Sequence, residues 1–416
     1  MIFASVVSGF GLTDFLWVSG LCALAALVLL WPRSQRTQRV QCIVFITIGL
    51  MCLAFAWIRG HGEIPIRQLL TQNHLLISLL CAVSFLRLIT DTRAASGKTP
   101  KTGEKAFLQT ISGLHFFSSV INLSALIIFG DALSRNQKLG RTTATSLQRG
   151  FSLAALWSPF FAAMGTCLLY APGTRLPDLW KLSIPLCLFG LVFTWVEHRF
   201  RSTGGLGTFE GYPVNFRALW VPSLMVVCVL GANSVFPEVS VLVLVSALSV
   251  LVTAIVIAAR ESLSQAIATV RNFSYRRLPD MYGELILFFS TGIMATGISA
   301  LVAVTQPALN VVGFTPGIAI SLLAILLFLA VVGVHAIVSI VAASAIVAPL
   351  NPEPAVLALI FLVSWSVGAT GGPISGLNLA MQSRYGVTMR ECFTWNLRYT
   401  LTMFIGTSFI LLITLD

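Results

Sequence analysis

Long apolar stretches separated by short polar loops fill this chain of 416 residues. Hydrophobic residues make up 56% of the sequence and charged residues only 10%, and the charges gather between the stretches. A helix needs about 20 apolar residues to cross the hydrocarbon core of a bilayer. The pattern therefore predicts an all-α polytopic membrane protein with about ten transmembrane helices. The expected spans are 13–31, 40–58, 74–91, 106–132, 179–197, 216–235, 239–258, 282–303, 317–349 and 392–414.

Two further apolar stretches, 147–170 and 355–383, are each interrupted in the middle by Gly, Ser or Pro. The first is broken at 157–159, which reads WSP, and the second at 370–376, which reads TGGPISG. Each flanking half has about 10–14 residues, which is too short to cross a bilayer. Because Pro removes a backbone donor and Gly frees the backbone, we expect both stretches to turn back as re-entrant hairpins.

A short motif occurs twice at an offset of 220 residues, as GLHFFSSVINLSAL in 113–126 and GVHAIVSIVAASAI in 333–346. Each copy lies on the fourth span of its half, just before the interrupted stretch. Each half then holds five spans and one hairpin, and an odd number of spans inverts the second copy relative to the first. We therefore expect two inverted repeats, 1–210 and 211–416, which are typical of secondary transporters.

The tips of the two predicted hairpins are the expected substrate site, because non-helical backbone at membrane depth is tolerated only where it lines a cavity. A half-helix N-terminus presents free N–H groups and a positive dipole, which suits an anion. The alternative is a kinked helix with small residues at a packing interface. The expected binding residues are Ser158, Pro159, Asn122, Ser124, Thr370, Gly372, Pro373, Ser375 and Asn378.

His115 and His335 occupy the same position of the repeated motif. An intramembrane His is energetically unfavourable and usually functional, and imidazole can donate to an anion or relay protons. A His that hydrogen-bonds across a helix interface and locks two spans together explains the symmetric placement equally well. The proton-relay role and the structural role therefore both stay open.

The net charge of +11 comes from Lys and Arg in loops beside the spans, so it indicates topology and contact with bilayer lipids rather than nucleic acid. We take the more basic side as the cytoplasmic side of a bacterial inner membrane. The basic stretches on this side are 32–39, 92–105, 197–217, 259–281 and 384–390. One basic stretch falls on the opposite side and disagrees; it carries Arg135, Lys138, Arg141 and Arg149.

No enzyme chemistry and no metal site are indicated. The sequence has no Walker A motif, and neither HxxxH nor GxSxG is present. Asp131, Glu197 and Glu284 lie near span ends, and no acidic residue lies in the middle of a span, which argues against a carrier that protonates a buried carboxylate. We expect Arg149 and Arg398 to snorkel to the interface, with pairing to a substrate carboxylate as the alternative.

With two inverted repeats, each with a polar hairpin tip beside a polar helix, most of the chain resembles the ion transporter superfamily of secondary carriers. This group includes divalent-anion/sodium symporters, citrate carriers, arsenite permeases and the large membrane subunits of tripartite periplasmic transporters. The resemblance implies hairpin tips that bind substrate and coupling ion, an elevator-like movement and often a homodimer. The Ser-Asn-Thr tip signature of the divalent-anion symporters is replaced here by WSP at 157–159 and GPISG at 372–376.

These features favour a secondary active transporter that moves a small anionic solute, an organic acid or an inorganic anion, by alternating access. A sodium ion or a proton would be the coupling ion, and no other cofactor is expected. One alternative is the large subunit of a tripartite transporter, whose partners would be a small membrane subunit and a periplasmic binding protein. Alternatives of other classes are a membrane-embedded enzyme or assembly factor for lipid or polysaccharide, and a channel.

Overall fold

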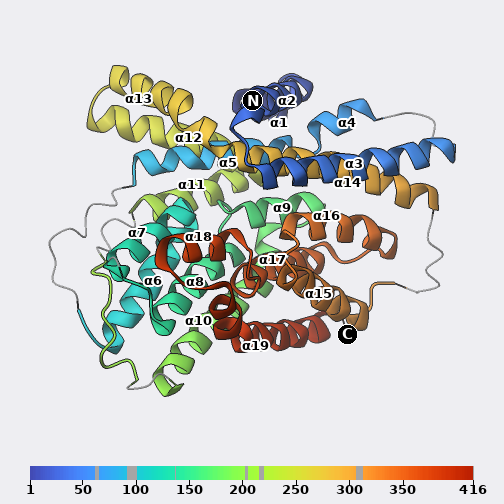
Figure 1. Ribbon diagram of the computed structural model, residues 1–416. Coiled ribbons are helices and arrows are strands. Elements are labelled where there is room, and N and C mark those ends of the chain that lie inside the picture. The colour runs from blue at the N-terminus through green and yellow to red at the C-terminus, as the bar shows by residue number, and fades with distance from the viewer. Residues whose placement is uncertain are drawn as a thin grey trace. The chain divides into compact units, whose positions relative to one another are not determined.

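The computed structural model describes the chain as a series of helices (Figure 1). It describes residues 1–60, 65–90, 101–135, 137–201, 205–214, 220–305 and 313–415. Parts of the predicted basic stretches 92–105 and 197–217, and the first residues of the span 216–235, lie outside the described residues. Among these described residues, eight helical segments are long and apolar enough to cross a membrane. The chain is an all-helical polytopic membrane protein, as the sequence predicts.

Two compact units make up the chain, and each draws on both halves of the sequence. Unit 1 comprises Met1–Ile89, Leu224–Val312 and Val341–Leu350. Unit 2 comprises Thr90–Ser223, Gly313–Ile340 and Asn351–Asp416. These units group residues by spatial contact, whereas the predicted repeats 1–210 and 211–416 concern the internal symmetry of the chain. The division into two repeats therefore stays a prediction.

Unit 1 contains two closely packed helix pairs. Its helices are α1 (Ile2–Gly9), α2 (Leu16–Leu30), α3 (Arg36–Ile58), α4 (Ile66–Thr71), α5 (His74–Ser84), most of α11 (Trp220–Val235), α12 (Val241–Arg260), α13 (Leu263–Arg276) and α14 (Tyr282–Thr305). The pairs are α3 with α14 and α5 with α12. A Cβ on Gly297 of α14 would overlap the carbonyl group of Gly49 of α3. Small residues permit this close approach, which increases van der Waals contact between helices inside a bilayer.

Unit 2 contains all of the predicted site residues. Its helices are α6 (Glu104–Ile121), α7 (Leu123–Ser134), α8 (Arg141–Leu153), α9 (Ala162–Tyr170), α10 (Leu176–Arg201), α15 (Pro316–Val331), α17 (Pro354–Gly371), α18 (Gly376–Tyr385) and α19 (Met389–Leu415). α16 (Ala336–Val347) begins in unit 2 and continues into unit 1.

Two predicted spans, 106–132 and 317–349, are wrong as single helices. The first breaks at Asn122, whose φ of 54° lies in the left-handed region. The second breaks at 332–335, where Gly333 has a φ of 96°. A right-handed helix cannot continue through such a residue. The sequence stays apolar on both sides of each break, so hydropathy alone does not reveal it.

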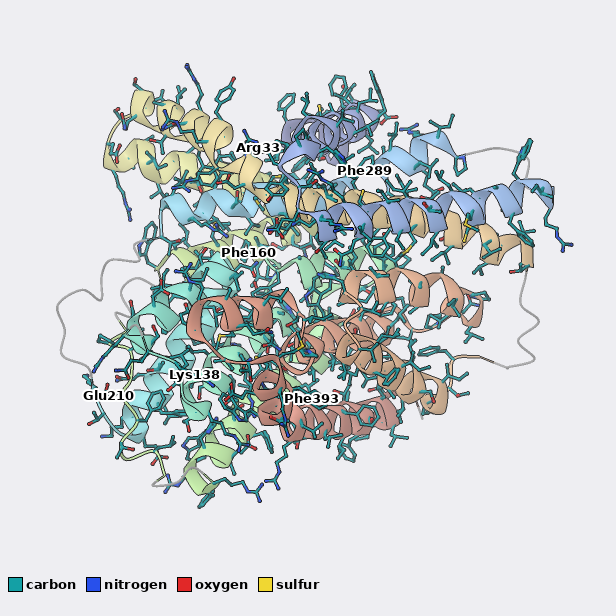
Figure 2. All side chains as sticks on the ribbon, viewed as in Figure 1. Arg33, Lys138, Phe160, Glu210, Phe289 and Phe393 are labelled. Carbon is teal, nitrogen blue, oxygen red and sulfur yellow. The ribbon has the colours of Figure 1, made fainter. Side chains whose placement is uncertain are left out.

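α6 and α7 form a helical hairpin with Asn122 at its tip. The last turn of α10 and the segment that follows it pair with the two outer ends of this hairpin. Arg199 binds Glu104 at the start of α6, and Glu210 binds Arg135 just after α7 at 2.9 Å. Glu210 is labelled in Figure 2. Both ends of the hairpin therefore lie at one face of unit 2.

The two interrupted stretches, α8 with α9 and α17 with α18, run alongside each other in opposite directions. Four hydrogen bonds join them, or the segments next to them, in order along their length. These bonds join Leu139 N to Tyr385 O (3.3 Å), Gln148 Nε2 to Asn378 Oδ1 (2.5 Å), Ser366 Oγ to Ser152 O (2.7 Å) and Thr174 Oγ1 to Pro354 O (2.9 Å).

This order of contacts shows that each stretch continues past its break. A helix rises about 1.5 Å per residue, so Ser152 lies about 16 Å along α8 from its first residue, Arg141, which Leu139 shortly precedes. Tyr385 pairs at one end of this length, and Pro354 pairs beyond the other. The predicted re-entrant turns within 147–170 and 355–383 are therefore not what the structure shows. Pro and Gly interrupt the hydrogen-bond ladder, but packing against the other stretch decides where the chain goes next.

The same pairing corrects the predicted placement of the basic stretch that follows α7. Lys138 pairs with Glu391 at 2.8 Å, and Arg384 pairs with Asp131 at 3.0 Å (Lys138 is labelled in Figure 2). The segments before α8 and after α18 thus lie at the same face of unit 2. The hairpin at Asn122 is the physical reason, since it adds one chain reversal that an unbroken span lacks. These basic residues then agree with the positive-inside rule.

Corresponding helices of the two halves begin 213 residues apart, for α8 and α17 (354 − 141 = 213) and for α10 and α19 (389 − 176 = 213). The division into two repeats stays a prediction. The 213-residue spacing of these helices differs from the 220-residue offset of the sequence motif, so the two motif copies do not lie at equivalent positions relative to these helices. His115 lies inside α6, whereas His335 lies in the break before α16. The expectation that each copy lies within a single helix is therefore wrong for both: Asn122 interrupts the first copy, and the break at 332–335 interrupts the second.

Candidate functional site

The break between α8 and α9 contacts the tip of the α6–α7 hairpin. The buried Ser158 hydroxyl donates to the carbonyl of Ser119 and accepts from the Phe160 amide at 3.2 Å. The Asn122 side-chain amide donates to the Phe160 carbonyl at 3.3 Å. Phe160, labelled in Figure 2, is 1% exposed. The structure therefore brings Ser158, its neighbour Pro159 and Asn122 together at a buried junction of two helix breaks.

Both ring nitrogens of His115 are used at this junction. The Nδ1 atom lies 3.0 Å from the Gly150 carbonyl, and Nε2 lies 2.9 Å from the indole Nε1 of Trp157. An indole N–H only donates, so Nε2 must accept and Nδ1 must carry the proton. A neutral His115 on α6 is thus bonded both to Gly150 of α8 and to Trp157 in the break that follows. This geometry favours the structural role, and a proton relay through His115 stays an untested prediction.

The second break, between α17 and α18, is held by its own side chains. The buried Asn378 amide donates to the carbonyls of Thr370 and Gly372, both at 2.9 Å. The Ser375 hydroxyl donates to the Ala369 carbonyl at 2.6 Å and accepts from the Asn378 backbone amide at 3.1 Å. Helix ends carry carbonyls and amides that lack partners, and these bonds satisfy several of them. In this conformation the predicted binding groups are therefore occupied within the protein.

Glycines let this second break approach the break between α15 and α16. A Cβ on Gly372 would lie 2.6 Å from the Ala330 carbonyl oxygen, which is closer than real Cβ atoms come. A Cβ on Gly333 would overlap the side chain of Ile374. His335 stands here beside Trp365, with ring centroids 5.5 Å apart. The same relationship therefore recurs in both halves: the break of an interrupted helix contacts the break of the preceding helix pair.

The remaining predicted residues lie within the same two groups. Ser124 is half-buried in the first turn of α7, next to the Asn122 tip, and Pro373 is half-buried in the second break. The Pro373 carbonyl accepts from the Gln382 side chain at 2.8 Å. The predicted binding residues thus form two groups. One lies where the Asn122 tip contacts the break after α8, and the other lies at the break between α17 and α18.

A buried ion pair that hydropathy and motif spacing do not predict lies beside these breaks. Arg149 of α8 and Glu197 of α10 are bonded at 2.5 Å between Nη1 and Oε2, and their side chains are 1% and 7% exposed. The guanidinium also donates to the carbonyl of Trp395 at 3.1 Å and lies 4.8 Å from the ring centroid of Tyr399. Arg149 therefore does not snorkel to the interface. A sequence signal existed, because Arg149 is the one charged residue between positions 142 and 174.

Hydrogen bonds connect this ion pair to the second break. The Arg149 Nε donates to Asn396 Oδ1 at 2.9 Å, and the Asn396 amide donates to Gln148 Oε1 at 3.0 Å. Gln148 in turn donates to Asn378 at 2.5 Å. Buried polar networks of this kind are energetically favourable only when their members are paired. Residues from α8, α10, α18 and α19 thus form one continuous buried network.

Within the described part of the chain, no group of three or more His, Cys, Asp or Glu side chains could hold a metal ion. The chemistry available at the site is instead that of hydrogen-bond donors, helix ends and one buried ion pair.

No protein-family model and no curated protein matches the chain. Among solved structures, the chain is similar to the YdaH transporter of Alcanivorax borkumensis, with 13% identity and a TM-score of 0.47. That match covers 90% of this chain and 97% of YdaH. The chain is also similar to MtrF of Neisseria gonorrhoeae, whose structure is described as illuminating a class of antimetabolite efflux pumps. The MtrF match has 13% identity and a TM-score of 0.48, and it covers 90% of this chain and 94% of MtrF.

Proposed function

We propose that this chain is a secondary active transporter that moves a small anionic solute across the membrane by alternating access. The observation that carries the proposal is the antiparallel pair of interrupted helices, with buried breaks at Ser158 and at Thr370–Gly372. Non-helical backbone at membrane depth needs a role to offset its unfavourable energy, and interrupted helices are typical of solute and ion sites in transporters.

Helix ends and a buried cation support an anionic solute. Two helices begin at the breaks, α9 at Ala162 and α18 at Gly376, so their N-terminal N–H groups and positive dipole ends lie at the interrupted region. Arg149 provides a buried guanidinium on α8, about two turns before the first break. The tip hydroxyls now donate to backbone carbonyls, and they become available to a solute when the interrupted helices shift during transport. A gradient of sodium ions or protons drives the cycle.

A thermal-shift screen of the purified full chain tests this function. The panel contains monocarboxylates, dicarboxylates, sulfonates and sulfate, each with and without sodium. A ligand that binds the folded state at 100 times its Kd stabilises it by about 2.7 kcal/mol, so at least one anion should raise the Tm. The matched control is Arg149→Gln, in which the same anion should have no effect.

The outcomes separate the alternatives. A Tm that responds to organic cations and to no anion would contradict an anionic solute. A Tm that no free solute changes would favour the large-subunit alternative, because a periplasmic binding protein would then deliver the solute. Uptake of the stabilising anion into proteoliposomes would separate a transporter from a membrane-embedded enzyme.

A further inference from the structure

Glu197 is the one buried acidic residue in the part of the chain that the structure describes. Its Oε2 atom binds Arg149, and its Oε1 atom is buried without a hydrogen-bond partner among the described residues. Buried polar atoms are almost always hydrogen-bonded, so a bare carboxylate oxygen indicates a site that takes up a proton or a donor in another state. The sequence placed Glu197 near the end of a span and gave it no role.

The surroundings of Glu197 contain few other charges. From α8, Arg149 and Arg141 both act electrostatically on its neighbour His198, whose Nε2 lies 3.0 Å from the hydroxyl of Thr145. From α19, Tyr399 packs against the guanidinium of Arg149. α17 also packs against α10 and carries no charged or titratable residue. The net charge at the pair itself is zero, since one guanidinium balances one carboxylate.

We propose that Arg149 and Glu197 couple transport of the anionic solute to protons, with one proton for each negative charge that Arg149 binds. In the step, the bond from Arg149 Nη1–H to Glu197 Oε2 breaks, and the carboxylate takes one proton and becomes a neutral carboxylic acid. The freed guanidinium N–H then donates to the solute anion. This inference rests on the proposed function, and it selects the proton over sodium.

The energetics of buried charge make this coupling obligatory. An isolated charge in a low-dielectric interior is very unfavourable, whereas a balanced pair is tolerated. With neither ligand, or with proton and anion together, the site is neutral. With the anion alone it carries one net negative charge, and with the proton alone one net positive charge. Both half-loaded states are therefore disfavoured, which is the requirement for tight symport.

The buried hydrogen-bond network that contains Arg149 connects binding of the proton and the anion to the second helix break. Arg149 and Gln148 are neighbours on α8, and both bond to the Asn396 side chain. Gln148 also bonds to Asn378, which closes the second break. When Arg149 turns from Glu197 towards a solute, the position of Asn396 changes, and with it the bonds that hold α18.

Binding measured against pH tests the inference. The probes are acetate, benzoate and methanesulfonate, because each keeps one negative charge from about pH 6 to about pH 8. If one proton enters with each anion, the wild-type Kd should rise about tenfold per pH unit wherever Glu197 is ionised in the free protein. The variant Glu197→Gln mimics the protonated acid, so its Kd should stay constant over this range. His198→Gln is the matched control and should keep the wild-type slope.

A second measurement avoids variants altogether, in case Glu197→Gln does not fold. Adding a saturating amount of the bound probe to weakly buffered wild-type protein should remove about one proton per chain from solution. A wild-type Kd that is independent of pH, no proton uptake, or a slope that persists in Glu197→Gln would overturn the inference and leave the transporter proposal intact. Failure of these three probes and of every anion in the thermal-shift panel to bind the wild type at any pH would instead refute the anionic solute, and the inference would fall with it.

Discussion

Asn378 offers the sharpest test of how the second helix break is held together. Its side chain is fully buried, and it donates to the carbonyls of Thr370 and Gly372 at 2.9 Å each. Its Oδ1 accepts from Gln148 at 2.5 Å. In Asn378→Ala, two carbonyls at the end of α17 and one amide of α8 lose their partner. The break and the buried network are therefore weakened by the same substitution.

The expected loss follows from the number of groups left unpaired. Side-chain hydrogen bonds between membrane helices contribute about 0.6 kcal/mol on average, so three of them sum to about 2 kcal/mol. A buried polar group that finds no new partner costs about 1–3 kcal/mol, which raises the upper value. Ala has a better helix propensity than Asn by up to about 0.7 kcal/mol, which offsets a small part. We expect Asn378→Ala to lower the free energy of unfolding by about 2–4 kcal/mol.

Unfolding in mixed micelles with increasing SDS measures this free energy by linear extrapolation. The matched control is Ser383→Ala on the same helix, because Ser383 is exposed and its one hydrogen bond, to Ala380, is 3.3 Å long. The control should stay within about 0.5 kcal/mol of the wild type. A similarly small change in Asn378→Ala would refute the reasoning. If that variant were stable but no longer bound the anion, Asn378 would be a direct binding residue, as the sequence predicts.

Three further predictions concern the glycines, the histidines and the topology. Gly372→Ala should destabilise the protein by about 1–3 kcal/mol because its Cβ meets the backbone of α15, whereas Gly376→Ala points into open space and should be neutral; equal effects in SDS unfolding would contradict the close approach. His115→Ala should cost more stability than His335→Ala, because His115 bonds to partners on both sides; comparable losses would restore the symmetric role. A cysteine at Lys138 should react with an impermeant maleimide from the cytoplasmic side, and labelling from outside would reject the corrected topology.

Hydropathy and the positions of Pro and Gly identify most helices of this chain, because both are local properties of the sequence. The spans 40–58 and 239–258 correspond to α3 and α12, and the breaks at 157–159 and 372–375 lie where Pro and Gly place them. The break at Asn122 escapes this reasoning, since Asn adopts a positive φ without any change in the hydropathy around it. One missed chain reversal is enough to place the following basic stretch on the wrong side.

Hydropathy along the sequence is enough to establish a polytopic helical membrane protein, and the positions of Gly, Ser and Pro identify the two interruptions that define the candidate site. That the interrupted helices continue past their breaks follows from tertiary packing, because it depends on contacts such as Ser152 with Ser366, far apart in the chain. The Arg149–Glu197 pair is likewise a property of packing. From the sequence, Arg149 and Glu197 each look like a charge at the membrane interface. Burial of both is energetically acceptable only because Nη1 of Arg149 on α8 lies 2.5 Å from Oε2 of Glu197 on α10.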